Sequence, residues 1–360
     1  VDHELNKIYC DNSLVDKDMA NKFKSSNPNV LVIYETQALE LWWNALPSFW
    51  KDLLITQAMT SKRPTKEELH SIINIKNLKV GHFIQDAEPV SRLTNIEFLD
   101  ISDSKIDDLS PLYGLHNLKS LNVRNTEVSD LAPLSNLKNL KELNIENTNV
   151  KSLQALHELS NISKIYADGS KLTQDEVVAL KRKQRQLTVI YQTDDLRLWW
   201  GNLDMAWREI FNSHLTCNSN PTAEQLQSIV DLEEIVVDPN NVVYSLESLQ
   251  QMSFLRKLII NNNQIHDLTP LSDKDLLEVL SVSGNPVDDI TPLSNLLLLK
   301  NLNIENTPVS DLTPITNLKN IKVLNISGTS VRNLKPLVGF EHLEDLSIVN
   351  TYVKSVVPLE

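Results

Sequence analysis

The sequence predicts an α/β solenoid with a parallel sheet on its concave face, short 3-10 or helical turns on its convex face, and helical insertions that cap it. Three observations predict this fold. Hydrophobic residues recur every 22 residues, and a Pro-containing turn motif recurs with the same period. Much of the sequence is also repeated at an offset of 157 residues. A fixed period of about 20 to 50 residues is typical of repeat architectures.

Hydrophobic residues form two columns with this 22-residue step. The first column holds Leu99, Leu121, Leu143 and Ile165 and then, in a second register, Leu258, Leu280, Leu302, Leu324 and Leu346. The second column lies two residues further along and holds Ile101, Val123, Ile145, Ala167, Ile260, Val282, Ile304, Ile326 and Ile348. Because side chains alternate between the two faces of a strand, Leu121 and Val123 are expected inside and Asn122 outside. Each repeat is therefore predicted to contain a short parallel strand.

The turn that follows each strand carries its own motif. In "DLSPL" at 108–112 and "DLAPL" at 130–134, the Pro stands at a first helical position, where its missing N–H would have no partner. These segments are predicted to return the chain along the convex face. A polar column, expected to be buried and to bond the backbone of the neighbouring repeat, holds Ser104, Thr126, Thr148, Asn263, Asn285, Thr307, Thr329 and Thr351.

The repeat unit, L-x-x-L-x-L-x-x-T-x-V-x-D-L-x-P-L, resembles the 22-residue bacterial leucine-rich repeat of the internalin type. It is also similar to the eukaryotic phosphatase-regulator subclass of the same length. The resemblance covers Leu93–Ser170 and Leu255–Glu360 and implies a curved solenoid with a parallel sheet on the concave face. The family usually has Asn in the polar column, whereas the first array here has Ser or Thr. A weaker ladder of hydrogen bonds is therefore expected.

Helical insertions precede each array. The stripe Trp42, Leu46, Trp50 and Leu53 predicts one amphipathic helix, and Trp199, Leu203, Trp207 and Ile210 repeat it. A second helix is predicted after the capping boxes Thr65–Glu68 and Thr222–Gln225, and it resembles the helical cap of internalins. A third capping box, Thr173–Glu176, opens the segment Leu172–Tyr191, which is predicted to be a helix and then a strand that close the first array.

The duplication divides the chain into predicted segments. Residues 1–38 are expected to end a preceding repeat module, and 39–77 to form a helical cap. Residues 78–192 hold the first array with its closing helix and strand, 193–234 the second cap, and 235–360 the second array. Because Val1 enters in the middle of a module, an upstream element is expected. A hinge is expected near Thr193–Leu198, and the sequence leaves open whether the arrays form one continuous solenoid.

Composition and motifs exclude several classes of function. A net charge of -13 argues against nucleic-acid binding, and the basic run Lys181–Arg185 is interpreted as a solvated helix face. No apolar stretch approaches the about 20 residues that span a bilayer. No catalytic motif is found, and the eight histidines show no metal-ligand spacing, so no enzyme, cofactor or metal is predicted. The lone thiols Cys10 and Cys217 fit the cytoplasm without excluding export.

The concave face is the predicted binding surface for a protein or peptide. Residues that flank the inward columns point to it, among them Phe98 and Ser120. The residues predicted to contact the ligand are Asp100, Arg124, Glu142, Asn144, Glu146, Tyr166, Asn303 and Glu305. An ordinary solvated sheet face is the structural alternative.

The Trp-rich caps suggest a second hypothesis. Trp43 and Trp200 lie beside the apolar stripe and are predicted to be exposed, which would suit stacking on a glycan, whereas Trp42, Trp50 and their copies fill the core. Further alternatives are an intracellular scaffold and an accessory segment of an enzyme. The predicted location is extracellular or on the cell surface, with the cytoplasm as the alternative.

Overall fold

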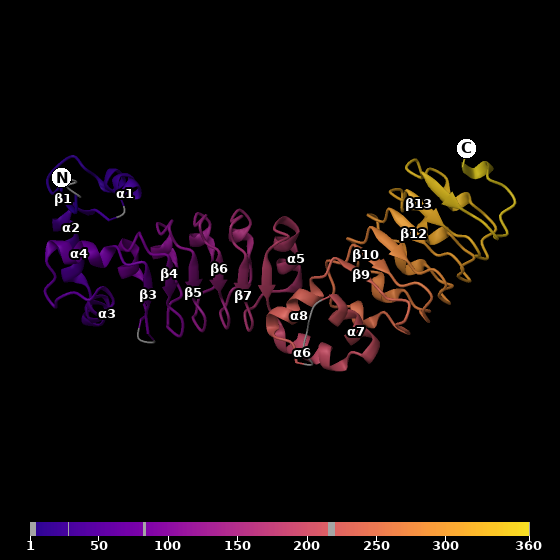
Figure 1. Cartoon of the computed structure of the whole chain (residues 1–360), viewed down its shortest axis with the longest axis horizontal. Coiled ribbons are helices and arrows are strands. Elements are labelled where there is room, and N and C mark those ends of the chain that lie inside the picture. Colours follow the sequence, from indigo (N-terminus) through magenta and orange to yellow (C-terminus); the bar gives the residue numbers. More distant parts are fainter. Residues whose placement is uncertain (1–4, 28, 82–83, 215–219, 360) are drawn as a thin grey trace. The chain divides into compact units, whose positions relative to one another are not determined.

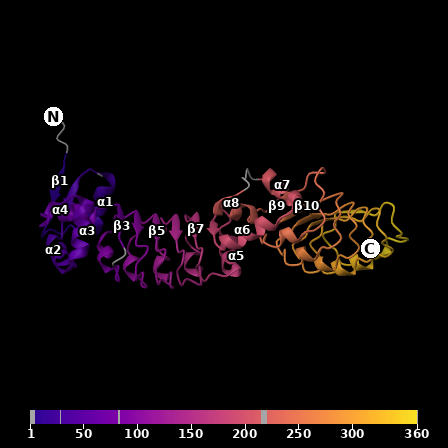
Figure 2. The ribbon, with the colours of Figure 1, turned by 90° about the horizontal axis from the view of Figure 1, so that it is seen from below.

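The computed structural model describes residues 5–27, 29–81, 84–214 and 220–359. The chain folds into two compact units, residues 1–191 and 192–360. Each unit contains one six-stranded parallel sheet whose strands follow one another in chain order. Figures 1 and 2 show the successive repeats of the first unit stacked as turns of a coil. The solvent-facing side of each sheet is called its concave face below.

The strands lie where the columns predict them. The first sheet consists of β3 (Asn77–Lys79), β4 (Phe98–Asp100), β5 (Ser120–Asn122), β6 (Glu142–Asn144), β7 (Lys164–Tyr166) and β8 (Thr188–Ile190). The second consists of β9 (Glu234–Val236), β10 (Lys257–Ile259), β11 (Val279–Ser281), β12 (Asn301–Asn303), β13 (Val323–Asn325) and β14 (Asp345–Ser347). Leu99 pairs with Leu121, and Leu121 pairs with Leu143, so the 22-residue step is the register of the sheet. The predicted parallel strands are confirmed.

Short 3-10 turns return the chain, as the Pro motif predicts. They are η1 (Glu88–Arg92), η2 (Ser110–Leu112), η3 (Ala132–Leu134), η4 (Gln154–Leu156), η5 (Glu247–Leu249), η6 (Thr269–Leu271), η7 (Thr291–Leu293), η8 (Thr313–Ile315), η9 (Lys335–Leu337) and η10 (Val357–Leu359). An Asp two residues before several of these turns bonds their first N–H, as Asp130 Oδ1 accepts from the Ala132 N–H at 2.8 Å. The hydrophobic columns are buried between sheet and turns, except in the last repeat, where Leu346 and Ile348 are partly exposed.

The described start of the chain repeats the element order that closes the first sheet. It contains β1 (Lys7–Tyr9), α1 (Lys17–Ser26) and β2 (Leu31–Ile33), and the closing segment contains β7, α5 (Gln174–Lys183) and β8. Ile8 pairs with Val32, and Ile165 pairs with Val189 in the same way. Equivalent strand partners in the two copies are therefore also 157 residues apart. Thr173 caps α5 as predicted, but the Glu176 carboxylate accepts from Ser152 and from the Leu153 N–H instead of completing a capping box.

The caps differ from the prediction of one Trp-rich helix in each copy. The first contains α2 (Thr36–Ala45), α3 (Ser48–Ala58) and α4 (Lys66–Ile73), and the second contains α6 (Thr193–Asn202), α7 (Met205–His214) and α8 (Ala223–Val230). Leu46 is extended because the following Pro47 disfavours helical backbone before it. In the second copy Leu203 is extended as well, and Asp204 starts α7 by accepting from the Trp207 N–H. The capping boxes Thr65–Glu68 and Thr222–Gln225 are confirmed.

This break changes the face that the tryptophans present. The buried positions of α2 are Thr36, Leu39 and Trp43, so Trp43 is only 7% exposed, and Trp200 is only 6% exposed in the second copy. The prediction that these two side chains are exposed is wrong, because the predicted stripe runs across two separate helices. Trp42 and Trp199 are the partly exposed members of each pair.

The polar column forms two kinds of hydrogen bond. Ser and Thr hydroxyls donate within their own repeat, as Thr148 does to the Ile145 carbonyl at 2.7 Å. Only the longer Asn side chains reach the preceding repeat, where Asn285 Oδ1 accepts from the Ile265 N–H at 3.0 Å. The predicted bond to the neighbouring repeat is therefore confirmed for Asn and wrong for Ser and Thr.

A second ladder lies one residue before the polar column. Asn125 donates to Asp103 at 2.6 Å, and Asn147 donates to Asn125 at 2.8 Å. All three residues have positive φ, a conformation that Asn, Asp and Gly adopt most readily. The fourth position is Gly169, where a Cβ would stand 2.1 Å from Asn147 Oδ1.

Candidate ligand-binding surface

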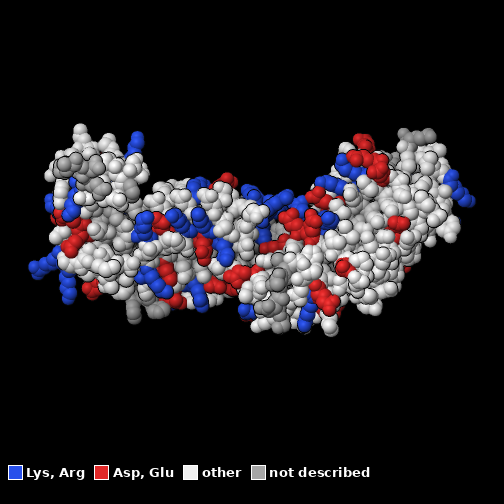
Figure 3. Space-filling model, viewed as in Figure 1, with Lys and Arg blue, Asp and Glu red and all other residues white. Residues whose placement is uncertain are grey.

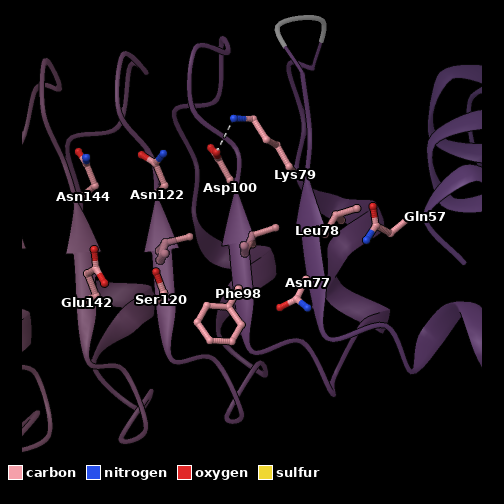
Figure 4. Close-up of a pocket in the computed structure, with 12 residues that line it drawn as sticks. Gln57, Asn77, Leu78, Lys79, Phe98, Asp100, Ser120, Asn122, Glu142 and Asn144 are labelled. Atoms are coloured by element: carbon pink, nitrogen blue, oxygen red, sulfur yellow. Dashed lines mark ion pairs between the residues drawn. The ribbon is translucent and has the colours of Figure 1, made fainter.

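The concave face of the first unit contains a hollow of about 420 Å³ at its cap end. Figure 4 shows it over β3 to β6, with Gln57 of α3 at one side. Two rows of side chains line it, because the first and third residues of each strand face solvent while the central Leu faces the core. The first-residue row is Asn77, Phe98, Ser120 and Glu142, and the third-residue row is Lys79, Asp100, Asn122 and Asn144.

The first-residue row presents an exposed ring and a free charge. Phe98 is 49% exposed although it lies in the middle of the hollow. Glu142 is exposed, and among the described residues its carboxylate has no ion pair or hydrogen bond. Ser120 lies between them on β5 and is small, so it leaves the ring and the carboxylate accessible. A ligand can therefore reach both groups from the same side.

The third-residue row is occupied by bonds within the protein. Asp100 Oδ2 lies 3.2 Å from Lys79 Nζ, and its Oδ1 accepts from the hydroxyl and the N–H of Ser102 at 2.6 and 3.0 Å. Partial burial acts to raise the pKa of Asp100, but the Ser102 hydrogen bonds and Lys79 outweigh it and lower the pKa below its usual value. Asp100 is consequently a charged group whose acceptor oxygens are already in use.

Asn side chains in this row end their strands. Asn122 Oδ1 accepts from the Arg124 N–H at 3.1 Å, and Asn144 Oδ1 accepts from the Glu146 N–H at 2.9 Å. These local bonds fix the backbone in a turn after each strand, so the strand does not continue. Asn144 also donates to the Glu146 carboxylate at 3.0 Å. The row therefore shapes the floor of the hollow.

The predicted contact residues of the first unit fall into two groups. Asp100, Glu142 and Asn144 line the hollow. Arg124 and Glu146 lie beyond the strand ends, with Arg124 Nε 3.8 Å from Glu146 Oε2. Tyr166 lies on β7 with Lys164 Nζ 5.5 Å from its ring centroid.

The cap and the first strand contribute residues to this surface that the repeat pattern does not predict. Gln57 lies on α3, and the predicted Trp stripe does not show which face of α3 is exposed, because the stripe runs across the break between α2 and α3. Asn77 and Lys79 lie on a strand that precedes the first 22-residue step. The signal that could have found the two β3 residues is Leu78, which lies 21 residues before Leu99 and pairs with it.

The concave face of the second unit has a different chemistry. Asn303 Oδ1 accepts from the Glu305 N–H at 3.1 Å, and Asn325 donates to the Glu305 carboxylate at 3.1 Å, so both predicted residues have partners. The neighbouring solvent-facing positions hold Val236, Ile259, Val279 and Val323. This floor is more apolar than that of the first unit.

Charged side chains form a ladder beside each sheet. Glu97 pairs with both Lys76 and Lys119. The hydrogen bond from Lys119 and then that from Lys76 lower the pKa of Glu97. In the second unit Arg256 pairs with Glu233 and with Glu278. Figure 3 accordingly shows cationic and anionic side chains interspersed rather than gathered into one basic patch.

The cap tryptophans pack the helices onto the array. Trp199 Nε1 donates to the Ser248 carbonyl at 3.1 Å, and Trp207 Nε1 donates to the Ser245 carbonyl at 2.9 Å. Since Trp43 and Trp200 are buried, neither presents the open ring face that stacking on a sugar requires. The structure therefore assigns the rings to the interface between cap and array.

Titratable groups elsewhere have structural surroundings. Within residues 5–27, 29–81, 84–214 and 220–359, no group of three or more His, Cys, Asp or Glu side chains could hold a metal ion. His3, His82 and Cys217 lie outside those residues. His70 is buried, and its Nε2 accepts from the Tyr34 N–H at 2.9 Å. Burial lowers the pKa of His70 to about 4.

Comparison with known proteins agrees with this repeat geometry. A family model described as leucine-rich repeats in two copies matches residues 116–172. The solenoid is built of leucine-rich repeats. No curated protein sequence matches the chain. In the described part of the leucine-rich repeat chain, no helix has the length and apolar character needed to cross a membrane.

Several solved structures are similar to this leucine-rich repeat chain. An internalin from Listeria monocytogenes is 22% identical, with 87% of this chain and 92% of that chain covered and a TM-score of 0.37. A leucine-rich repeat protein from Leptospira interrogans is 15% identical, with 80% and 87% covered and a TM-score of 0.34. The plant peptide hormone receptor RGFR1, in complex with RGF2, is 13% identical, with 78% and 48% covered and a TM-score of 0.32.

Proposed function

We propose that the chain is a non-enzymatic binding protein that recognises a protein or peptide on its concave face. The observation that carries this proposal is the hollow of the first unit, where a half-exposed Phe98 lies in one row with Glu142, whose carboxylate has no partner among the described residues. An exposed aromatic ring offers a ligand a large apolar contact area, and a charged carboxylate beside it can accept a strong, directional hydrogen bond. Leucine-rich repeats commonly mediate protein–protein interactions, which supports the same assignment.

The proposed contact residues differ in what they can offer a ligand. They are Asp100, Arg124, Glu142, Asn144, Glu146, Tyr166, Asn303 and Glu305. The Glu142 carboxylate bonds no other described residue, and Arg124 has about half of its side-chain surface exposed, so these two can form directional contacts. Arg and Tyr side chains are enriched among the anchors of interfaces. Asp100, Asn144 and Asn303 act mainly by fixing the shape of the floor.

Peptides selected from a random displayed library supply a ligand for the test. Their affinity is compared for the parent chain and for Arg124→Ala, Tyr166→Ala and Lys138→Ala. Lys138 is the matched control, because its Nζ bonds the Ser135 and Glu158 carbonyls at the return turns. We expect Arg124→Ala and Tyr166→Ala to weaken binding by about 1 to 2 kcal/mol and Lys138→Ala to leave it unchanged. The opposite ranking would move the site away from the concave face.

The carbohydrate hypothesis is not proposed, because Trp43 and Trp200 are buried. An extracellular or cell-surface location remains part of the proposal, with the cytoplasm as the alternative. Fractionation of cells that produce the protein tests it. Recovery in the medium or the surface fraction supports the location, and recovery only in the cytoplasm contradicts it.

A further inference from the structure

The first-residue row holds the groups of the hollow that are left for a ligand. Among the described residues, the Glu142 carboxylate and the side-chain amides of Gln57 and Asn77 have no protein partner. The third-residue row, by contrast, is satisfied within the protein through the Lys79–Asp100 ion pair and the Asn bonds. A ligand therefore meets one line of free groups, which crosses the strands from Asn77 to Glu142 (Figure 4).

The spacing along this line is set by the sheet. Phe98, Ser120 and Glu142 are in register on β4, β5 and β6. Neighbouring strands lie about 4.8 Å apart, so Phe98 and Glu142 are separated by about 9.6 Å across the strands. A polyproline II helix rises about 3.1 Å per residue with three residues per turn, so its side chains i and i+3 point the same way about 9.3 Å apart. The two repeats match.

Other backbone conformations fit this line less well. An extended strand presents every second side chain to one face, about 6.6 Å apart, which matches neither one nor two strand spacings. In an α-helix the residues i and i+7 lie about 10.5 Å apart, about 0.9 Å more than the separation of the two anchors, whereas the polyproline II step differs from that separation by only about 0.3 Å.

We propose that the hollow binds a ligand segment in the polyproline II conformation, with an apolar side chain on the Phe98 ring and a Lys or Arg on Glu142 three positions away. This inference rests on the proposed function and adds the class of ligand. Gln57 and Asn77 donate to carbonyls of the segment, which a polyproline II backbone leaves without internal hydrogen bonds. Ser120 is small enough to let the two intervening residues pass over β5.

Synthetic peptides test the spacing and the charge separately. The probe is acetyl-PPLPPKPP-amide, together with its reversed sequence, because either direction places the two anchors three positions apart. The first comparison peptide, PPLPKPPP, has the same composition with the anchors two positions apart, and the second, PPLPPEPP, carries Glu in place of Lys. Binding is measured by titration calorimetry with the full chain. We expect both comparison peptides to bind at least about tenfold more weakly, equivalent to a loss of about 1.4 kcal/mol.

Matched variants assign the effect to the two anchors. Glu142→Gln and Phe98→Ala should each weaken the probe about tenfold, and Glu142→Lys should prefer the Glu peptide over the Lys peptide. Glu158→Gln makes the same charge change at an exposed residue after η4 and should leave binding unchanged. Circular dichroism and thermal unfolding verify that each variant is folded, which is expected because neither anchor belongs to the core.

Three results overturn the inference: no binding of the probe at about millimolar concentration, equal binding of the two-position peptide, or equal binding by Glu142→Gln. Library-selected peptides distinguish this failure from failure of the proposed function. Selected peptides that lose affinity on Arg124→Ala or Tyr166→Ala but lack the spaced pair overturn this inference alone. Selected peptides that are indifferent to every concave change overturn both.

Discussion

Replacing Lys274 by Met removes a charge that the second unit buries. Lys274 is 2% exposed and stands at the repeat position that Leu296 and Leu318 occupy in the next two repeats. Its Nζ donates to the Gln250 carbonyl at 3.3 Å and lies 2.8 Å from Asp273 Oδ1, but the Asp273 side chain is 71% exposed. Burying an ammonium group costs several kcal/mol, and a pair with a solvated carboxylate offsets only part of that cost.

The expected effect of Lys274→Met is a gain of about 1 kcal/mol in the free energy of unfolding. Exchange of buried ion pairs for apolar side chains is often neutral or stabilising by about 1 to 4 kcal/mol. The unbranched Met can follow the path of the Lys stem, while the Gln250 carbonyl loses a hydrogen bond worth about 1 kcal/mol. Urea unfolding measures the difference, with Leu296→Met as the control, expected to cost less than about 1.5 kcal/mol. A loss above about 1 kcal/mol for Lys274→Met would show that the buried ammonium group stabilises the second unit.

Three further predictions concern the first unit. Leu143→Ala should cost roughly 2 to 5 kcal/mol in urea unfolding, because Leu143 is fully buried at the centre of β6, and a loss near zero would contradict its place in the core. Gly169→Ala should lower the free energy of unfolding by about 1 to 2 kcal/mol or more, because its φ is +68 and an added Cβ would meet Asn147 Oδ1. Gly114→Ala is the control: an added Cβ there meets nothing within 4 Å, so the free energy of unfolding should change by less than about 0.5 kcal/mol. Burial lowers the pKa of His70 from 6.5 to about 4, so the unfolded chain binds more protons than the folded chain between these pH values, and the free energy of unfolding should fall as the pH drops from 6.5 to 4. The free energy of unfolding of the His70→Gln variant should depend less on pH over this range. An unchanged pH dependence would assign the effect to other groups.

The repeats could be predicted from the sequence because their 22-residue period is the step from one strand of the sheet to the next. A column such as Leu99, Leu121 and Leu143 is apolar in every repeat because each member packs against the next, and the same step sets the register of the sheet. The polar column was only half predictable. Its burial follows from its position, but whether it reaches the neighbouring repeat depends on side-chain length, which separates Asn285 from Thr148.

The caps and the hollow were harder to predict. The predicted apolar stripe requires one continuous helix through Leu46. The helix breaks before Pro47, and the shorter helix α2 buries Trp43 instead of Trp42. The hollow depends on Gln57 of α3 lying beside β3, which is a tertiary contact that no periodicity encodes. Asp100 was predicted to contact a ligand from its position alone, and only the structure shows that Lys79 and Ser102 already use its oxygens.

Photo-crosslinking of a library-selected peptide to the full chain can locate the surface on which the peptide binds. The peptide carries a benzophenone side chain, and mass spectrometry locates the crosslinked residues. Recognition on the concave face predicts crosslinks in 77–79, 98–100, 120–122 and 142–144, the strand segments that line the hollow, and in 164–166 of the neighbouring strand β7. Crosslinks confined to the return turns η2 to η4 or to the cap helices α6 to α8 would contradict recognition on the concave face.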